Sequence, residues 1–157
     1  MIIRSARPDD LEALVELERR GIDGPWSPGQ LRAELDLPVS LVLVAKDETG
    51  VSGYAVIRFM EPEAELLRLV VHPGYRRQGV AGQLLASVCM HAVDRGVETC
   101  FLEVRSSNVA ALRLYQGLGF SVCGRRPNYF DRPVEDALLM KKEFSVCRRK
   151  DENNSGY

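Results

Sequence analysis

The sequence lacks the features that mark membrane proteins and nucleic-acid-binding proteins. Its 157 residues contain no apolar run long enough to span a membrane, and the N-terminus has no hydrophobic segment typical of a secretion signal. The formal net charge is only -1, so the chain has no basic field that would attract nucleic acid or a membrane surface. We therefore expect a cytoplasmic protein that binds neither.

The sequence also lacks any cysteine pattern typical of a metal or redox site. No two of its four cysteines stand at a short paired spacing; they are Cys89, Cys100, Cys123 and Cys147. Scattered cysteines of this kind favour reduced packing thiols, and we expect no metal ion. The two histidines suggest no site either, because His72 precedes a proline at a strand end and His91 lies within a helix.

Internal repeats and long linkers are absent as well, which favours a single domain. The composition, 45% hydrophobic and 27% charged, is that of an ordinary globular protein. We expect one domain over residues 1–145, which is long enough to bury a sizeable core. The polar residues 146–157 are expected to form a disordered tail.

The most informative stretch present is the one from Leu66 to Leu85. It begins as an apolar run that ends at His72-Pro73, crosses a turn rich in Gly and Arg, and resumes with helical periodicity. A strand, a basic glycine turn and a helix together direct free backbone N–H groups and the positive end of a helix at an anion. Phosphate binding is therefore one hypothesis. The alternative is that Gly79 and Gly82 only punctuate an ordinary turn.

The pattern of the whole chain predicts a mixed α/β fold in the order β-α-α-β-β-β-α-β-α-β-β. Helices are expected over 7–21, 28–36, 84–95 and 108–117. Strands are expected over 1–6, 40–46, 51–60, 64–72, 97–104, 120–125 and 136–144. Residues 47–50 should form a four-residue hairpin loop. Because a helix crosses between the strands at 64–72 and 97–104, these two should be parallel neighbours.

Two motifs resemble the signatures of the GNAT superfamily of N-acetyltransferases, which use acetyl-CoA. Arg76-Arg77-Gln78-Gly79-Val80-Ala81 is similar to the motif that holds the cofactor's pyrophosphate in that family. The stretch from Asn108 to Phe120, a capped helix that ends in Tyr and then Leu-Gly-Phe, is similar to its second signature. The resemblance implies a GNAT fold, with a mixed central sheet flanked by about four helices.

A closer resemblance is to the RimI branch, which acetylates the N-terminal α-amine of a small-subunit ribosomal protein. It rests on Pro25-Trp26-Ser27, on Leu102 to Asn108, and on Arg126 to Phe130 followed by Glu135-Asp136-Ala137. The chain departs from the branch at Arg68, at Phe130 and at Gly117. The alternatives are a GNAT enzyme that acetylates a lysine side chain or a small amine, and a non-catalytic acyl-CoA sensor.

The resemblance implies that Glu103 is the base and Tyr115 the acid of acetyl transfer. Glu65 is the rival base, since other GNAT branches place theirs nearby. Without the resemblance, Glu103 would be a strand-end carboxylate that pairs with Arg105 or is solvated, and Tyr115 an ordinary core tyrosine. An α-amine also suits a modest base, because deprotonating a lysine at neutral pH costs about 3.5 kcal/mol more.

The resemblance also implies where the cofactor and the acceptor bind. Main-chain groups of Leu69, Val70 and Val71 would pair with the pantetheine arm like an added strand, provided that the strands at 64–72 and 97–104 splay apart. An N–H group near Val70 or Val71 would bind the oxyanion. The pyrophosphate would be held by Arg76, Arg77, Gln78, Gly79, Val80, Ala81 and Gly82, with a further contact from Asn108. Acceptor contacts are assigned to Trp26, Tyr129 and Phe130, whose alternative role is hydrophobic packing. We expect a monomer or a weak dimer.

Overall fold

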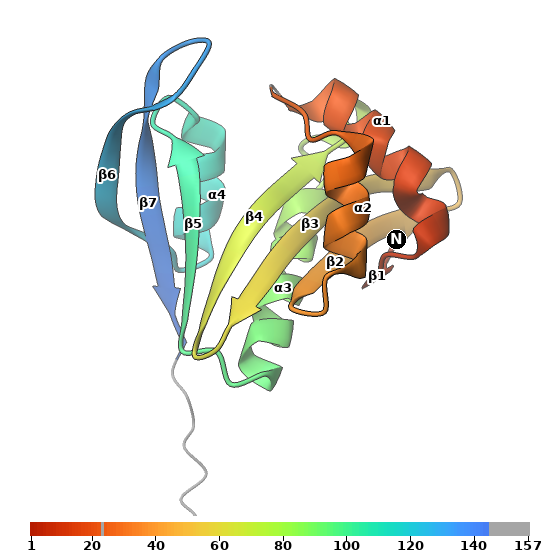
Figure 1. Ribbon diagram of the computed structural model, residues 1–157, viewed down its shortest axis with the longest axis horizontal. Helices are drawn as coiled ribbons and strands as arrows, with labels where there is room; N and C mark the ends of the chain where they lie inside the picture. Colours follow the sequence, from red (N-terminus) through yellow and green to blue (C-terminus); the bar gives the residue numbers. More distant parts are fainter. Residues whose placement is uncertain (23, 145–157) are drawn as a thin grey trace, which may run out of the picture.

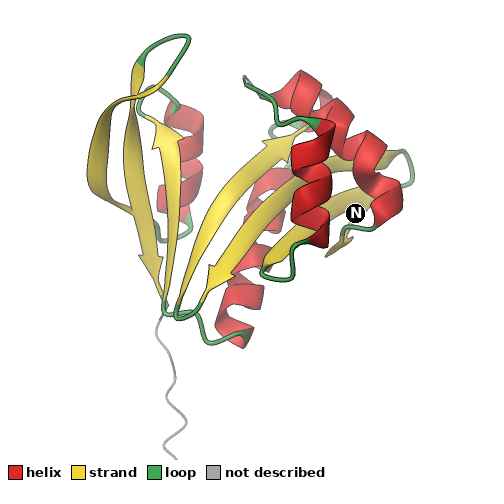
Figure 2. Cartoon of the chain, in the orientation of Figure 1, coloured by secondary structure: helices red, strands yellow, loops and turns green. Residues whose placement is uncertain are grey.

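A seven-stranded mixed sheet forms the centre of the fold, and helices cover both of its faces (Figures 1 and 2). The computed structural model describes residues 1–22 and 24–144, so Cys147 and the predicted tail 146–157 lie outside the described residues. The helices are α1 (Leu11–Gly21), α2 (Pro28–Asp36), α3 (Val80–Asp94) and α4 (Val109–Gly117). The strands are β1 (Ile2–Ser5), β2 (Ser40–Asp47), β3 (Gly50–Met60), β4 (Glu63–Val71), β5 (Thr99–Arg105), β6 (Ser121–Phe130) and β7 (Glu135–Glu143).

The strand order across the sheet is β1-β2-β3-β4-β5-β7-β6. β4 and β5 are parallel, and the other neighbouring strands are antiparallel. The predicted element order and the predicted parallel pair are therefore confirmed. The long helix α3 makes the crossover between the two parallel strands, as the chain length between them requires.

Local side-chain caps explain where two of the helices begin. Ser27 and Gln30 form the reciprocal capping box that precedes α2: Ser27 Oγ accepts from the Gln30 N–H at 3.1 Å, and Gln30 Oε1 accepts from the Ser27 N–H at 2.8 Å. At α4, Asn108 Oδ1 accepts from the N–H of Ala111 at 3.2 Å. α1 is preceded by a short 3-10 turn at Pro8–Asp10. These caps are local in sequence, which is why the helix starts were predictable.

Three predicted boundaries are wrong. α3 begins at Val80, four residues before its predicted start at Leu84, and the other two errors lie in strand pairs. The hairpin between β2 and β3 has two loop residues rather than four, because Asp47 and Gly50 already pair across the ladder. Gly50 has φ +124°, a conformation that side chains rarely adopt. β6 continues to Phe130 instead of ending at residue 125, because β7 provides partners as far as Glu135.

The pairing of β4 with its two neighbours positions the site. A β-bulge shifts the β3–β4 register between Val56 and Ile57, and as a result Leu66 packs on the α3 face while Arg68 reaches α1 on the other face. On its other edge, β4 pairs with β5 only over Glu63–Leu66 and Thr99–Leu102. Beyond these residues the two strands diverge (Figures 1 and 2). This is the splay that cofactor binding was expected to need.

The apolar side chains form two clusters, one on each face of the sheet. The larger cluster joins the sheet to α3 and α4 and includes Leu84, Leu85, Leu102 and Tyr115. The smaller one joins it to α1 and α2, through residues such as Leu14 and Leu31. Within the described residues, no helix is both long enough and apolar enough to cross a membrane.

Two glycine substitutions test this packing in opposite directions. A Cβ at Gly53 in β3 would lie 2.9 Å from the backbone oxygen of Val70 and 3.2 Å from side-chain carbons of Val80 and Leu84. We expect Gly53→Ala to lower the free energy of unfolding by about 1–3 kcal/mol. A Cβ at Gly117 in α4 meets nothing within 4 Å, so Gly117→Ala should raise it by about 0.4–1 kcal/mol. Urea unfolding of the two variants measures both changes. A Gly53→Ala variant as stable as the unmodified protein would contradict the close approach of β4 and α3 to Gly53.

Candidate active site

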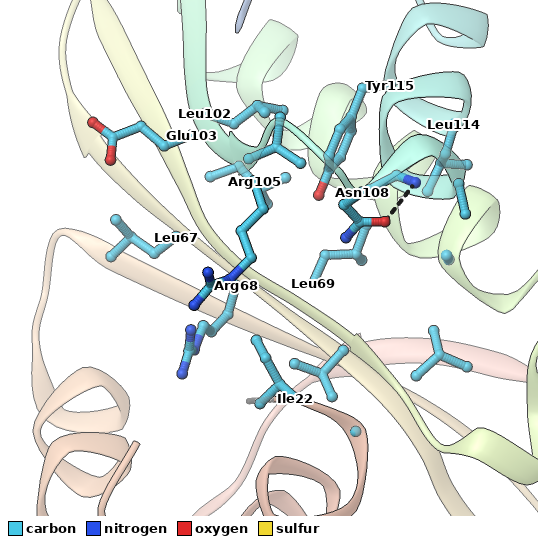
Figure 3. Close-up of a pocket in the computed structure, with 18 of the residues that line it drawn as sticks. Ile22, Leu67, Arg68, Leu69, Leu102, Glu103, Arg105, Asn108, Leu114 and Tyr115 are labelled. Carbon is cyan, nitrogen blue, oxygen red and sulfur yellow. Dashed lines mark hydrogen bonds between the residues drawn. The ribbon is translucent and has the colours of Figure 1, made fainter. Parts of the chain in front are cut away.

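A cleft of about 780 Å³ opens where β4 and β5 diverge (Figure 3). Its walls come from the two strands, from α4, from the C-terminal end of α1, from the start of α3 and from the end of β6. These segments are far apart in the sequence, and the sheet order brings them together. The cleft therefore lies at the carboxyl ends of two parallel strands, the usual location of binding sites in α/β sheets.

One wall of the cleft is a strand edge with free main-chain groups. The His72 N–H donates to the Ser52 carbonyl at 2.8 Å, and antiparallel partners alternate between hydrogen-bonded and non-bonded pairs. In the register of β3 and β4, the groups of Val70 therefore face β3, whereas those of Leu69 and Val71 face the gap. Of the three residues predicted to bind the cofactor arm, Leu69 and Val71 have main-chain groups directed toward the gap.

The turn before α3 forms the end of the cleft with the most free N–H donors. Gly79 precedes the helix in the left-handed region at φ +80°, and its position has no side-chain cap. The first intrahelical bond runs from the Gln83 N–H to the Gly79 carbonyl, so the N–H groups of Val80, Ala81 and Gly82 have no partner within the helix. The first turn of α3 contains no acidic residue. This geometry suits an anion.

The basic residues of that turn differ in what they contact. Arg76 lines the cleft with Ala81, and its Nη2 donates to the Gly21 carbonyl at the end of α1 at 3.2 Å. Arg77 is exposed and has a positive φ of 63°. His72 accepts from the Gly74 N–H at 2.9 Å and is a turn residue, as expected.

Tyr115 reaches the cleft from α4, and its hydroxyl is directed into it (Figure 3). The ring is buried and packs edge-on against Phe120 at 5.9 Å between centroids. Burial raises the pKa of Tyr115 to about 12. The phenol therefore stays protonated at neutral pH and can donate a hydrogen bond to a group in the cleft.

Glu103 is the first residue of β5 after its pairing with β4 ends at Leu102. Its Oε1 lies 3.2 Å from Arg126 Nε, so the ion pair that it forms is with Arg126 and not with Arg105. A hydrogen bond with Glu103 and the charge of that carboxylate raise the pKa of Tyr129. The rival Glu65 lies in the paired part of β4, opposite Phe101, and does not line the cleft.

Glu103 and Tyr115 approach the cleft from opposite faces of the sheet. Leu102 and Val104 pack in the cluster that also contains Tyr115, on the face of α3 and α4. Side chains alternate along a strand, so Glu103 points to the other face, and Figure 3 shows the two side chains well apart. A reaction in the gap would thus have a carboxylate on one side and a phenol on the other.

Comparison with known proteins agrees with this geometry. The family model of the acetyltransferase (GNAT) family matches residues 11–120, most of the chain. The chain belongs to the GNAT acetyltransferase family. Members of this family take an acetyl group from acetyl-CoA, so the chain is an acetyl-CoA-dependent N-acetyltransferase.

Several relatives within the GNAT family match over nearly their full length. The chain is 34% identical to the [ribosomal protein bS18]-alanine N-acetyltransferase of Escherichia coli strain K12, over 92% of this chain and 98% of that protein. It is 30% identical to a putative enzyme of the same name from Bacillus subtilis, over 88% and 92%. The crystal structure of the ribosomal-protein-S18-alanine N-acetyltransferase from Escherichia coli has a TM-score of 0.89 at 32% identity and covers 95% of this chain and 97% of that one.

The residues predicted to contact the acceptor occupy different positions in this GNAT site. Phe130 lines the cleft, and Tyr129 lies beside it, in contact with Phe130 and with Glu103. Trp26 packs against the smaller apolar cluster and carries the Arg68 guanidinium 4.6 Å above its ring. Trp26 therefore packs against the apolar cluster, whereas Tyr129 and Phe130 of β6 adjoin the cleft.

Sequence reasoning assigned no role to two arginines of the cleft or to the carboxylate buried beside one of them. Arg68 and Arg105 both line the cleft, and Glu18 of α1 is buried beneath Arg68. The one available signal was that Arg68 replaces the small polar residue usual in the RimI branch. Helical spacing places Glu18 on the inner face of α1 with Leu14, and the structure confirms its burial, but the spacing does not indicate its partner.

The contact between Glu103 and Tyr129 predicts a spectroscopic shift. The Glu103 carboxylate disfavours the phenolate, so Glu103→Gln should lower the pKa of Tyr129 toward the ordinary value near 10. Ultraviolet titration of tyrosinate, with Tyr129→Phe to assign the transition, measures the change. Tyr115 is the internal control, because burial alone raises its pKa and Glu103→Gln should leave it in place. An unchanged Tyr129 transition would contradict the contact.

Proposed function

We propose that the chain transfers the acetyl group of acetyl-CoA to the N-terminal α-amino group of a protein, and that the acceptor is a ribosomal protein. The observation that carries this proposal is the near-complete match to relatives named for the alanine of ribosomal protein bS18. A ribosomal acceptor implies a cytoplasmic enzyme.

The charges of the cleft also support a peptide over a small cationic amine. The charged side chains that line it are Arg68, Arg76, Arg105, Glu103 and Asp131, so the cleft is not acidic. A site for a polyamine or a cationic antibiotic would need an excess of carboxylates to bind the extra positive charges. A peptide N-terminus needs one carboxylate near its amine and open space for the following residues.

For the acetyl-CoA site, we assign the pyrophosphate to the start of α3. The free N–H groups of Val80, Ala81 and Gly82 can bind phosphate oxygens, and Arg76 and Arg77 supply positive charge. Gln78 and Gly79 shape the turn, and Asn108 fixes the start of α4. Leu69 and Val71 present main-chain donors and acceptors that can pair with the pantetheine arm as a strand would.

In the reaction, Glu103 takes a proton from the acceptor amine and Tyr115 donates one toward the leaving thiolate. A carboxylate base suffices for an α-amine, whose pKa is about 7.7–8.0, better than for a lysine amine at about 10.4. Tyr115 stays protonated because burial raises its pKa to about 12. The N–H of Leu69 or Val71 faces the gap and can stabilise the oxyanion, whereas the Val70 N–H faces β3.

The acceptor class is tested by mass spectrometry of peptides incubated with the enzyme and acetyl-CoA. We expect a peptide with a free N-terminus to gain one acetyl group on its α-amine. The same peptide with a blocked N-terminus and an internal lysine should remain unmodified, because deprotonating the lysine costs about 3.5 kcal/mol more. Acetylation confined to lysines would exclude the α-amine as acceptor, and binding of coenzyme A without any turnover would favour a sensor.

The catalytic residues are tested by substitutions that keep their shapes. Tyr115→Phe and Glu103→Gln should each lower kcat by about 100-fold or more, since general acid and base catalysis contributes typically 10²–10⁴-fold. Their affinities for acetyl-CoA should stay close to that of the unmodified enzyme. Glu65→Gln is the matched control, because Glu65 lies in the paired part of β4. A larger loss of kcat in Glu65→Gln than in Glu103→Gln would transfer the role of base to Glu65.

A further inference from the structure

Two arginines, one on each diverging strand, border the acceptor side of the cleft. Arg68 of β4 and Arg105 of β5 both lie beyond Leu66 and Leu102, where the pairing of β4 with β5 ends. Both side chains line the cleft (Figure 3). Neither has a role in the chemistry proposed above. Each is bound to one of the two loops that flank the cleft, which gives the pair a common function.

Arg68 holds the segment between α1 and α2. Its Nε and Nη2 donate to Glu18 at 3.2 and 3.0 Å, and Nη2 also donates to the Gly24 carbonyl at 3.1 Å. Its guanidinium lies 4.6 Å from the centre of the Trp26 ring. The Arg68 side chain is 14% exposed and that of Glu18 is 1% exposed, so these contacts are shielded from solvent.

The buried Glu18 accepts hydrogen bonds from several donors. In addition to Arg68, it accepts from the Trp26 N–H at 3.0 Å and from the Tyr54 hydroxyl. Burial first, and then the bond to Glu18, raise the pKa of Tyr54, which keeps this phenol protonated as a donor. The hydrogen bonds to Glu18 offset the free-energy cost of its desolvation, and they fix the position of Trp26 relative to β4.

Arg105 holds the loop between β6 and β7 in the same way. Its Nη1 lies 3.4 Å from Glu135 Oε2 and 3.3 Å from the Pro133 carbonyl, and its Nη2 lies 3.4 Å from the Asp131 carbonyl. Its guanidinium stacks 4.4 Å from the centre of the Phe130 ring. Glu135 is in turn bound by the Ser107 N–H at 2.6 Å.

Both arginines thus use the same set of contacts: a carboxylate, loop carbonyls and an aromatic face. A guanidinium is suited to this set because its planar fork donates in the plane while its face stacks on a ring. The aromatic partners, Trp26 and Phe130, are two of the residues predicted to contact the acceptor. The arginines therefore orient Trp26 and Phe130, of which Phe130 lines the cleft, and they do so from the two strands that enclose the gap.

We propose that Arg68 and Arg105 are positioning residues that hold the loops on either side of the acceptor subsite and so set its width and its selectivity for the first residue of the acceptor. The identity of the acceptor rests on the proposed function, whereas the contacts by which the two arginines hold the loops do not depend on it. The free main-chain groups of Leu69 and Val71 and the start of α3 are separate from these contacts. Acetyl-CoA binding should therefore be independent of the two arginines.

The test compares variants in three measurements: KM for an acceptor peptide, affinity for acetyl-CoA, and amide hydrogen exchange of the two loops. Arg68→Gln alone would leave a buried carboxylate with fewer donors, so the double variant Glu18→Gln/Arg68→Gln, which removes both charges, is used for the first loop. Arg105→Gln tests the second loop independently. Arg95→Gln is the matched control. The Arg95 guanidinium lies 4.1 Å from the centre of the Phe59 ring, and neither residue lines the cleft.

We expect each loop variant to raise the peptide KM about tenfold, the equivalent of one lost charge-assisted contact, while kcat and acetyl-CoA affinity change less than about twofold. Exchange should accelerate around Gly24 and Trp26 in the first variant and around Asp131 and Val134 in the second. Both variants should accept larger first residues than the unmodified enzyme does. Arg95→Gln should change none of these quantities.

Other outcomes would overturn the proposal. Unchanged exchange in both loops or a loss of kcat at constant peptide KM would assign the arginines another role. So would a loss of acetyl-CoA affinity as large as the rise in peptide KM. Arg68→Lys and Arg105→Lys keep the charge without the fork or the planar face, so they should recover only part of the loss; full recovery would show that charge alone acts. If the unmodified enzyme acetylates only lysines, the proposed function fails, but the exchange measurement still tests the loops because it needs no acceptor.

Discussion

The loss of pairing between β4 and β5 is the constraint on which the site depends. The two parallel strands share hydrogen bonds only up to Leu66 and Leu102, and the bulge in the β3–β4 register turns the next residues of β4 toward new partners. Unpaired main-chain groups in a protein interior are costly unless a ligand or water satisfies them. The gap is kept open by elements packed on each side, α3 with α1 on one and α4 with β7 on the other, and its free strand edge is thereby available to bind an extended molecule.

The residues around the same gap are divided between the two faces of the sheet. Tyr115 and the start of α3 lie on the face of the larger apolar cluster, whereas Glu103, Arg68 and Arg105 lie on the opposite face. A molecule bound along the edge of β4 from the α3 side would present its reactive end to an acceptor that arrives from the other side. The residues proposed as acid and base, Tyr115 and Glu103, therefore lie on opposite faces of the sheet.

The sequence predicted the parts of the fold that depend on near neighbours in the chain. The capping box at Ser27, the cap at Asn108 and the crossover between β4 and β5 were all readable, because each rests on local spacing or on connection length. The bulge, the splay and the extension of β6 were not, because they depend on which strands become neighbours. For the site, the motif match indicated Glu103 and Tyr115, but their placement on opposite faces needed the sheet. The Glu18–Arg68 pair joins residues far apart in the sequence, and no spacing rule could predict it.

Among the described residues three carboxylates are buried, Asp10, Glu18 and Glu34, and each is paired with an arginine. Of those arginines only Arg68, the partner of Glu18, lines the cleft. A buried ion pair such as Glu18–Arg68 contributes little net stability compared with apolar residues of the same size. It does, however, constrain geometry, because a guanidinium satisfies its donors in only a few orientations. Beside the gap, Arg68 and Glu18 hold the segment before α2 against β4, whereas α3 is held on the sheet by apolar packing. The site's precision on the acceptor side therefore depends on directional contacts, and substitutions there should alter selectivity before they alter chemistry.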